Sequence, residues 1–224
     1  MFKRYAIFYT PQGGLADWGA RWLGWDSRTG RATRRHALYG IDVQALTRAP
    51  SKYGLHGTLK APFALAGNAD STQLAQTAES FARTHAPVDA GPFEMRYENG
   101  FIALRPRETM PALRDLATQA VRGFDPLRAP LSDDDIARRR RARLSLRQDQ
   151  QMLAWGYPFI FEDFHFHLTL TGRLPAPSAA HVIAALEADV QPVLPARIVI
   201  DAITVMGEDA NGLFHQLHRC TLTR

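Results

Sequence analysis

The sequence predicts an α+β fold built from two related halves, because one motif and one turn each occur twice along its 224 residues. The motif His56-Gly57-Thr58-Leu59 returns as His167-Leu168-Thr169-Leu170, and Asn99-Gly100 returns as Asn211-Gly212 at almost the same offset along the chain. Asn-Gly between alternating apolar runs is a strong hairpin signal, because both residues accept positive φ. Two independent markers with nearly the same offset indicate one internal duplication.

The same elements are expected in each half, in the order strand, helix and hairpin. The motif itself lies in an apolar, β-prone stretch in both copies. The elements that follow are a helix over 71–85 and strands over 93–97 and 101–105 in the first half, and a helix over 178–190 and strands over 197–205 and 213–222 in the second.

The remaining elements lie outside the repeat. We expect a strand over 5–10, a helix over 15–25 whose tryptophans recur every three or four residues, and a helix over 111–122 that begins at a proline. The tryptophan side of the second of these is expected in the core. The stretch 124–157 has no counterpart in the second half, and this stretch and 27–51 are candidates for insertions or lids over a site.

We therefore expect one two-lobed domain over 1–224, with approximate lobes 1–123 and 158–224 and a helical insertion over 124–157. A hydrophobic content of 46% and a charged content of 22% are ordinary for a soluble globular protein of this length. The single cysteine, Cys220, excludes a framework of intrachain disulfides and fits a reducing compartment. The apolar run at the start is too short for a signal peptide, and no stretch reaches the roughly 18 apolar residues of a membrane span, so we expect a cytoplasmic protein.

The formal net charge of +5 favours anionic partners, and much of the excess lies in the run Arg138 to Arg141 with Arg143 and Arg147 after it. Ser132 followed by three aspartates resembles a helix start, so one interpretation is a solvated helix that is acidic first and basic later. The other is an electropositive rim that steers a phosphorylated substrate. Nucleic-acid binding is possible but not favoured, because no aromatic residues that could stack on bases interrupt the run.

The two motifs carry the chemistry that we expect at the functional site. Residues i and i+2 of a strand share a face, so each motif presents an imidazole and a hydroxyl side by side. Two imidazoles can act as base and acid in one turnover, which makes His56 and His167 the candidate catalytic pair. Thr58 and Thr169 can donate hydrogen bonds to phosphoryl oxygens, and Lys60 on the same expected strand face can neutralise phosphate charge.

His165 leaves a metal-dependent alternative open. It precedes His167 by two residues, and a His-x-His pair in a strand is a familiar metal-binding arrangement that a third ligand from His56 would complete. We favour a metal-free and cofactor-free site, because no aspartate or glutamate lies at a suitable spacing near either motif and the threonines would have no role in a metal site.

Paired H-x-T motifs in a duplicated chain of this size resemble the 2H phosphoesterase superfamily. The longer stretches Tyr53 to Phe63, Trp155 to Pro158 and Phe166 to Leu174 are similar to an uncharacterised branch whose members are commonly named phosphonate-metabolism proteins. The resemblance implies two pseudo-symmetric lobes of antiparallel sheet with outer helices around a central cleft. It also implies metal-independent hydrolysis of a cyclic phosphodiester of a small sugar phosphate or nucleotide, with a ribose cyclic phosphate such as 5-phosphoribosyl 1,2-cyclic phosphate as a candidate substrate.

Two other functions stay open at this point. One is an RNA 2′,3′-cyclic phosphodiesterase or RNA-end ligase, which the basic charge supports. The other is a non-catalytic protein that binds a phosphorylated ligand in the same cleft. In each case the partner is phosphorylated and no membrane is involved; the sequence predicts nothing about oligomeric state.

Overall fold

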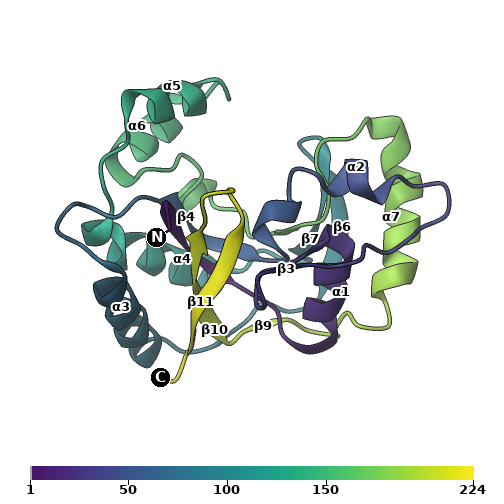
Figure 1. Cartoon of the computed structure of the whole chain (residues 1–224), viewed down its shortest axis with the longest axis horizontal. Helices are drawn as coiled ribbons and strands as arrows, with labels where there is room; N and C mark the ends of the chain where they lie inside the picture. Colours follow the sequence, from purple (N-terminus) through teal and green to yellow (C-terminus); the bar gives the residue numbers. More distant parts are fainter. Residues whose placement is uncertain (1) are drawn as a thin grey trace.

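The computed structural model describes residues 2–224, and within them seven strands form one continuous antiparallel sheet (Figure 1). The strand order is β11-β10-β1-β4-β8-β7-β6. The strands are β1 (Arg4–Tyr9), β4 (Gly57–Phe63), β6 (Phe93–Glu98), β7 (Phe101–Pro106), β8 (Leu168–Thr169), β10 (Ala202–Glu208) and β11 (Phe214–Thr221), and the short pairs β2 (Trp25–Asp26) with β3 (Arg31–Ala32) and β5 (Val88–Asp89) with β9 (Val199–Ile200) lie outside the sheet. The mixed α+β class predicted from the sequence is confirmed.

The strands of the two sequence halves interleave in this sheet. The first motif strand, β4, lies beside β1, which is followed by the β10–β11 hairpin of the second half. The second motif strand, β8, lies beside the β6–β7 hairpin of the first half. Each hairpin thus extends the part of the sheet that holds the motif of the other half. The boundaries 1–123 and 158–224 remain a proposal about which residues belong to each copy of the duplicated unit.

Equivalent residues of the two halves pair with each other at the centre of the molecule. Gly57 pairs with Leu168, and these are the middle residues of the two motifs. In the same way Val88 pairs with Ile200 and Asp89 with Val199, so β5 pairs with its own counterpart β9. A two-fold operation on two copies of one unit produces this pattern, because it places the same element of each copy on the axis.

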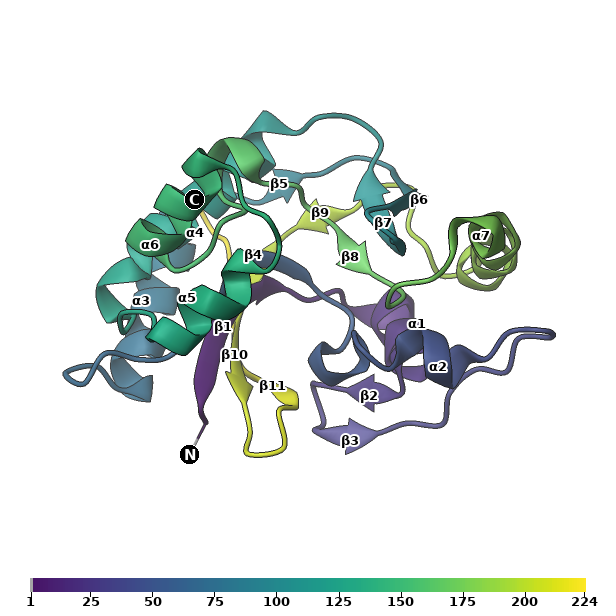
Figure 2. The same ribbon diagram turned by 90° about the horizontal axis from the view of Figure 1, so that it is seen from above.

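Helices cover the outer face of the sheet in two groups (Figures 1 and 2). Helix α3 (Ser71–Thr84) packs on β10 and β11, α4 (Pro111–Gly123) packs on β4, and α7 (Ala176–Val190) packs on β6. Helix α1 (Gly13–Leu23) buries Trp18 and Trp22, as its periodicity predicts, and the Trp22 indole N–H donates to the Leu170 carbonyl at 2.7 Å. Each such large apolar side chain contributes roughly 1.5–3 kcal/mol on burial.

The opposite face of the sheet carries a smaller apolar cluster, and this face holds the motifs. In β1, Tyr5, Ile7 and Tyr9 join the main core, whereas Ala6 and Phe8 point the other way, toward Met206 and Phe214. Strand alternation explains the split, since successive side chains lie on opposite faces. Tyr53, from the turn Ser51–Tyr53, covers this second cluster.

The two hairpins differ in their turns. Asn99 (φ 54°) and Gly100 (φ 86°) form the two-residue turn that the sequence predicts, with Glu98 paired to Phe101. The second hairpin closes with Glu208 paired to Phe214. Its loop is longer because the Asp209 carboxylate accepts hydrogen bonds from the backbone amides of Asn211 and Leu213 and so stabilises a wider turn.

The insertion over 124–157 contains two helices, α5 (Asp133–Arg140) and α6 (Leu146–Trp155), which lie together at one end of the molecule (Figure 1). The Ser132 hydroxyl accepts from the amide of Asp135 and caps α5, as its sequence predicts. Ion pairs of Arg140 with Asp149 and of Arg147 with Asp163 tie the helices to each other and to the loop that precedes β8. The stretch 27–51 contains α2 (Val43–Thr47). No helix among residues 2–224 is long and apolar enough to cross a membrane.

Candidate active site

The two motifs lie side by side at the middle of the sheet. Because Gly57 pairs with Leu168 in antiparallel register, His56 lies opposite Thr169 and Thr58 lies opposite His167. All four side chains therefore share one face. Directly opposed Cβ atoms are about 5 Å apart and diagonal ones about 7–8 Å, so the histidines lie on the diagonal of a four-residue square that is about as wide as a phosphate group.

The two histidines make the same hydrogen bond. Nδ1 of His56 contacts the carbonyl of Gly54 at 2.9 Å, and Nδ1 of His167 contacts the carbonyl of His165 at 2.8 Å. A carbonyl only accepts, so both Nδ1 atoms carry a proton and donate. Nε2 is then the titrating atom of each ring, and it is free to take or give a proton on the shared face.

His56 lies in an apolar setting. Its ring stacks on Phe8 with the centroids 4.0 Å apart, and Tyr53 lies 5.3 Å away on another side. Burial lowers the pKa of His56 to about 4, the hydrogen bond to Gly54 opposes this shift, and positive charge on the nearby His167 adds to it. His56 is therefore neutral near pH 7.

His167 lies among charged groups. The ion pair between Arg105 and Glu98 (2.8 Å) is its neighbour, and its ring contacts Phe101 with centroids 5.6 Å apart. Burial lowers the pKa of His167, and the positive charge of Arg105 acts in the same direction, while the hydrogen bond to His165 and the Glu98 carboxylate oppose the shift. The effect of Arg105 on this pKa is larger than that of Glu98, but His167 has a carboxylate neighbour that favours its charged form and His56 has none.

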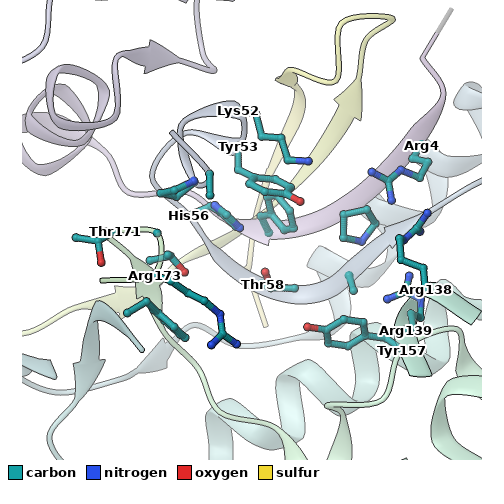
Figure 3. Close-up of a pocket in the computed structure, with 18 of the residues that line it drawn as sticks. Arg4, Lys52, Tyr53, His56, Thr58, Arg138, Arg139, Tyr157, Thr171 and Arg173 are labelled. Carbon is teal, nitrogen blue, oxygen red and sulfur yellow. The ribbon is translucent and has the colours of Figure 1, made fainter. Parts of the chain in front are cut away.

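The motif face opens into two adjoining cavities. One of about 810 Å³ is lined by His56, Thr58 and Thr169 (Figure 3), and one of about 730 Å³ is lined by His167. Thr58, Ala61, Phe101, Tyr157 and Arg173 line both, so the two cavities adjoin, with His56 in one and His167 in the other. We refer to the two adjoining cavities together as the cleft, and each of them is large enough for a small ligand.

Lys60 does not line either of these cavities. Its ammonium donates to the Val121 carbonyl at 2.9 Å and pairs with Asp125 at 3.2 Å, and the side chain is buried. The placement expected from strand alternation fails because the register shifts between the pairs Ile7–Lys60 and Phe8–Thr58, and this bulge turns Lys60 away from the face of Thr58. Burial lowers the pKa of Lys60 to about 8, which Asp125 opposes. Its role here is to hold the end of α4 and the following turn.

Arg173 supplies the positive charge beside the motifs that the sequence argument expected from Lys60. It borders both cavities, and Figure 3 shows its guanidinium extending into the space between His56 and Tyr157. No carboxylate among residues 2–224 forms an ion pair with it. A comparison of the two halves does not identify Arg173, because the equivalent position of the first half, counted from the motif histidine, is Pro62. The signal in the sequence that could have pointed to Arg173 as a site residue is its position shortly after Thr169.

Gly57 lets the two motif strands approach over an aromatic ring. A Cβ at this position would lie 2.2 Å from the Phe166 ring, which packs beneath the strand. Only glycine fits at this closest approach. The residue between the first histidine and threonine is therefore set by packing, whereas its counterpart Leu168 joins the core.

The structure also bears on the metal-dependent alternative. Among residues 2–224, no group of three or more His, Cys, Asp or Glu side chains could hold a metal ion. His165 lines the cavity of His167, and its backbone carbonyl rather than its imidazole contacts His167.

Comparison with known families places the chain. Residues 58–215 match the family described as "Protein of unknown function (DUF1045)". The chain belongs to the DUF1045 family. It is 33% identical over 218 residues to "Ribose 1,5-bisphosphate phosphokinase PhnN" of Janthinobacterium sp. (strain Marseille), a match that covers 93% of this chain and 48% of that protein. The chain of this DUF1045 protein spans about half the length of the curated relatives it matches.

Two solved structures are similar to the chain over their whole length. A crystal structure described as a phosphoesterase matches 100% of both chains with a TM-score of 0.50 at 14% identity. E. coli LigT in complex with phosphate matches 100% of this chain and 99% of its own with a TM-score of 0.47 at 12% identity. The first match confirms the phosphoesterase-like fold that the motifs predicted for this DUF1045 protein.

Proposed function

We propose that this DUF1045 protein hydrolyses a cyclic phosphodiester of a small sugar phosphate or nucleotide, with two histidines and no metal. The register of Gly57 with Leu168 carries the proposal, because it sets two imidazoles and two hydroxyls on one face of the sheet, where His56, Thr58 and Thr169 line one cavity and His167 lines the adjoining one. Each imidazole also presents Nε2 with Nδ1 already engaged. Two such imidazoles can act as general base and general acid in a reaction at one phosphorus atom.

We assign the roles of the two histidines on the basis of their different surroundings. His56, stacked on Phe8 in an apolar setting, is the neutral base, and its Nε2 takes a proton from the attacking water. His167, beside Glu98, is the acid, and its Nε2–H gives a proton to the leaving sugar oxygen. The water oxygen bonds to phosphorus as the P–O bond to the sugar breaks, and the ring opens to a phosphomonoester. A proton moved from His56 to His167 through solvent restores the pair.

Developing negative charge on the phosphoryl oxygens is met by donors already in place. Thr58 and Thr169 present hydroxyls to the cavity, and Arg173 presents a guanidinium without a competing carboxylate. Fixed donors of this kind stabilise the transition state without reorganisation, which is usually the largest catalytic effect. Arg173 takes the role in charge neutralisation that the sequence argument gave to Lys60.

The names of the relatives support a choice of substrate class. The curated relatives are named for a kinase that acts on ribose 1,5-bisphosphate, and this chain matches about half of their length. Proteins joined in one chain often act on related compounds. This association supports a ribose cyclic phosphate as substrate and a role in phosphonate metabolism.

The proposal is tested by a screen of chelator-treated protein against cyclic phosphodiesters. The panel contains ribose 1,2-cyclic phosphate, 2′,3′-cyclic nucleotides and RNA with a cyclic phosphate end. We expect ring opening of a small member to a phosphomonoester. Ring opening of the RNA alone would show an RNA-processing enzyme. Tight binding of a panel member without turnover would show a ligand-binding protein.

Activity should survive exhaustive chelation, because no step uses a metal ion. His165→Ala should retain turnover within about tenfold, since the His165 carbonyl that positions His167 remains. Both are measured as kcat on the best substrate of the panel. Activity lost to chelator and restored by zinc, together with a large loss in His165→Ala, would show a metallohydrolase instead.

The pH dependence of kcat/KM should be bell-shaped with its maximum on the acid side of neutrality. The acid must be charged, so the rate falls as pH rises through the pKa of His167, which burial lowers from the usual value of about 6.5. The base must be neutral, so the rate also falls as the pH decreases toward about 4, where His56 takes up a proton. A profile that rises from pH 5 to a plateau above pH 8 would contradict these roles.

A further inference from the structure

The larger cavity has a second cationic end, away from the histidines. Five cationic side chains line it and only one carboxylate does, that of Asp135. Arg4, Arg138 and Arg139 gather with Tyr157 on the side of the cavity opposite His56, with Thr58 between the two groups (Figure 3). We call Arg4, Arg138, Arg139 and Tyr157 the arginine end. It joins strand β1 to helix α5 of the insertion.

The arginine end holds positive charge that the protein itself does not neutralise. Arg4 pairs with the buried Glu208 at 2.5–2.8 Å, which fixes its position, and Arg138 pairs with Asp135. Arg139 forms no ion pair with any carboxylate among residues 2–224, and its Nε atom is buried without a hydrogen-bond partner. Burial lowers the pKa of Arg139, Tyr157 and Asp135 oppose this shift, and the charges of Arg138 and Arg4 add to it, because the three guanidinium groups lie close together.

Such a group has a recognisable ligand chemistry. Guanidinium groups bind phosphate through paired, charge-assisted hydrogen bonds, and several of them around one point favour a dianion. The Arg139 guanidinium lies 5.4 Å from the centre of the Tyr157 ring, and Figure 3 shows the Tyr157 hydroxyl directed from there toward the middle of the cavity. Arg139 lines the cavity and has no ion-pair partner among residues 2–224, so its guanidinium group can pair with an anion that enters there.

We propose that the arginine end is a subsite for a second phosphate group, so that the substrate carries a phosphomonoester in addition to the cyclic phosphodiester opened at the histidines. The inference rests on the proposed function and adds a substrate class to it. His56 and the arginine end line the same cavity of about 810 Å³, and His167 lines the adjoining one, so a single small sugar bisphosphate can extend from the histidines to the arginine end. The insertion is then a specificity element, because α5 supplies Arg138 and Arg139.

The compact shape of the subsite favours a terminal monoester over the backbone of RNA. The three arginines converge on one end of the cavity, whereas a strand of RNA needs cations spread along a path. A monoester also carries a second negative charge that a diester in RNA does not have. The preference is tested directly by comparing the two groups.

The test is a kinetic comparison of substrates that differ only in the second phosphate. Ribose 1,2-cyclic phosphate is assayed with and without a 5-phosphate, and a 2′,3′-cyclic nucleotide is assayed with a free 5′-hydroxyl, a 5′-phosphate or a 5′-linked nucleotide. The intact protein should prefer the monoester form by about 100-fold in kcat/KM, mostly through KM. Arg139→Gln should lose about 10- to 100-fold on that form and almost nothing on the unphosphorylated form.

Two further variants test whether the loss is specific to Arg139 or follows from replacing any arginine of this run. Arg138→Gln, on an exposed side chain, should show a smaller loss of the same selectivity. Arg141→Gln is the matched control, because Arg141 belongs to the same run, is exposed and does not line the cavity. Equal kcat/KM for the two forms in the intact protein, or equal losses on both forms in Arg139→Gln, would overturn the subsite while leaving ring opening intact. Equal preference for the 5′-linked nucleotide would assign the subsite to a phosphodiester instead.

A binding measurement separates the subsite from catalysis. Titration calorimetry with ribose 5-phosphate should show binding to the intact protein and to His167→Ala, and at least tenfold weaker binding to Arg139→Gln. If no substrate is opened, the proposed function fails and this measurement still decides the subsite. Equal binding by the intact protein and Arg139→Gln would overturn it.

Discussion

Replacing either His56 or His167 by alanine should lower kcat by about 100- to 10,000-fold, because each imidazole moves one proton of the reaction. The double variant should be barely slower than either single one, since the two residues act as a unit. Folding should change little, because neither side chain is part of the main core. Initial rates on the best cyclic phosphodiester, with thermal unfolding of each variant, measure both effects.

His181→Ala serves as the control for this prediction. His181 is exposed on α7 and lies outside the cavities of the motif face, so its loss should leave kcat unchanged. Turnover like that of the intact protein in either His56→Ala or His167→Ala would overturn the assignment. Losses that add up in the double variant would indicate separate roles in binding.

Arg173→Gln should lower kcat by about 100-fold with a smaller effect on KM. The guanidinium reaches into the cleft from the loop after the second motif and borders both cavities, so its charge acts on the phosphoryl oxygens as negative charge develops. Arg173→Lys should recover part of the rate, because it keeps the charge and loses the paired donors. Steady-state kinetics on one substrate separate kcat from KM.

Arg83→Gln is the matched control for Arg173. Arg83 is exposed in the last turn of α3, outside the cleft. A rise in KM without a fall in kcat for Arg173→Gln would show that Arg173 binds the ground state and transition state equally. Lys60→Met, by contrast, should act on stability and not on kcat, since Lys60 contacts Val121 and Asp125 away from the cleft.

The sequence predicts the centre of the site because the centre is made by local rules. Alternation along a strand puts the histidine and threonine of each motif on one face, and the offset that the motifs share with the Asn-Gly turns identifies the two copies. The register of Gly57 with Leu168 follows from symmetry, since the two copies meet at equivalent residues. Asn99-Gly100 forms its predicted turn for an equally local reason, the positive φ of both residues.

Features that depend on tertiary contacts could not be predicted from the sequence. The bulge that turns Lys60 away arises from the pairing of β4 with β1, and no local signal marks it. The hairpins join the part of the sheet that holds the other half's motif, which the order of elements along the chain does not reveal. Arg173 has proline as its counterpart in the first half, so a search for repeated residues passes over it. The arginine run was recognised, but only the structure separates Arg138 and Arg139, at the cavity, from Arg140, which pairs with Asp149.

The central claim, metal-free ring opening by two histidines, is tested most directly by ³¹P NMR of a cyclic phosphodiester in ¹⁸O-labelled water with excess chelator. The intact protein should convert the cyclic signal into that of a phosphomonoester that contains one ¹⁸O from the water. The variant with both His56 and His167 replaced by alanine should leave the ring closed over the same period. An intact ring with the unaltered protein for every cyclic phosphodiester tested, or ring opening at an undiminished rate by the double variant, would contradict the account.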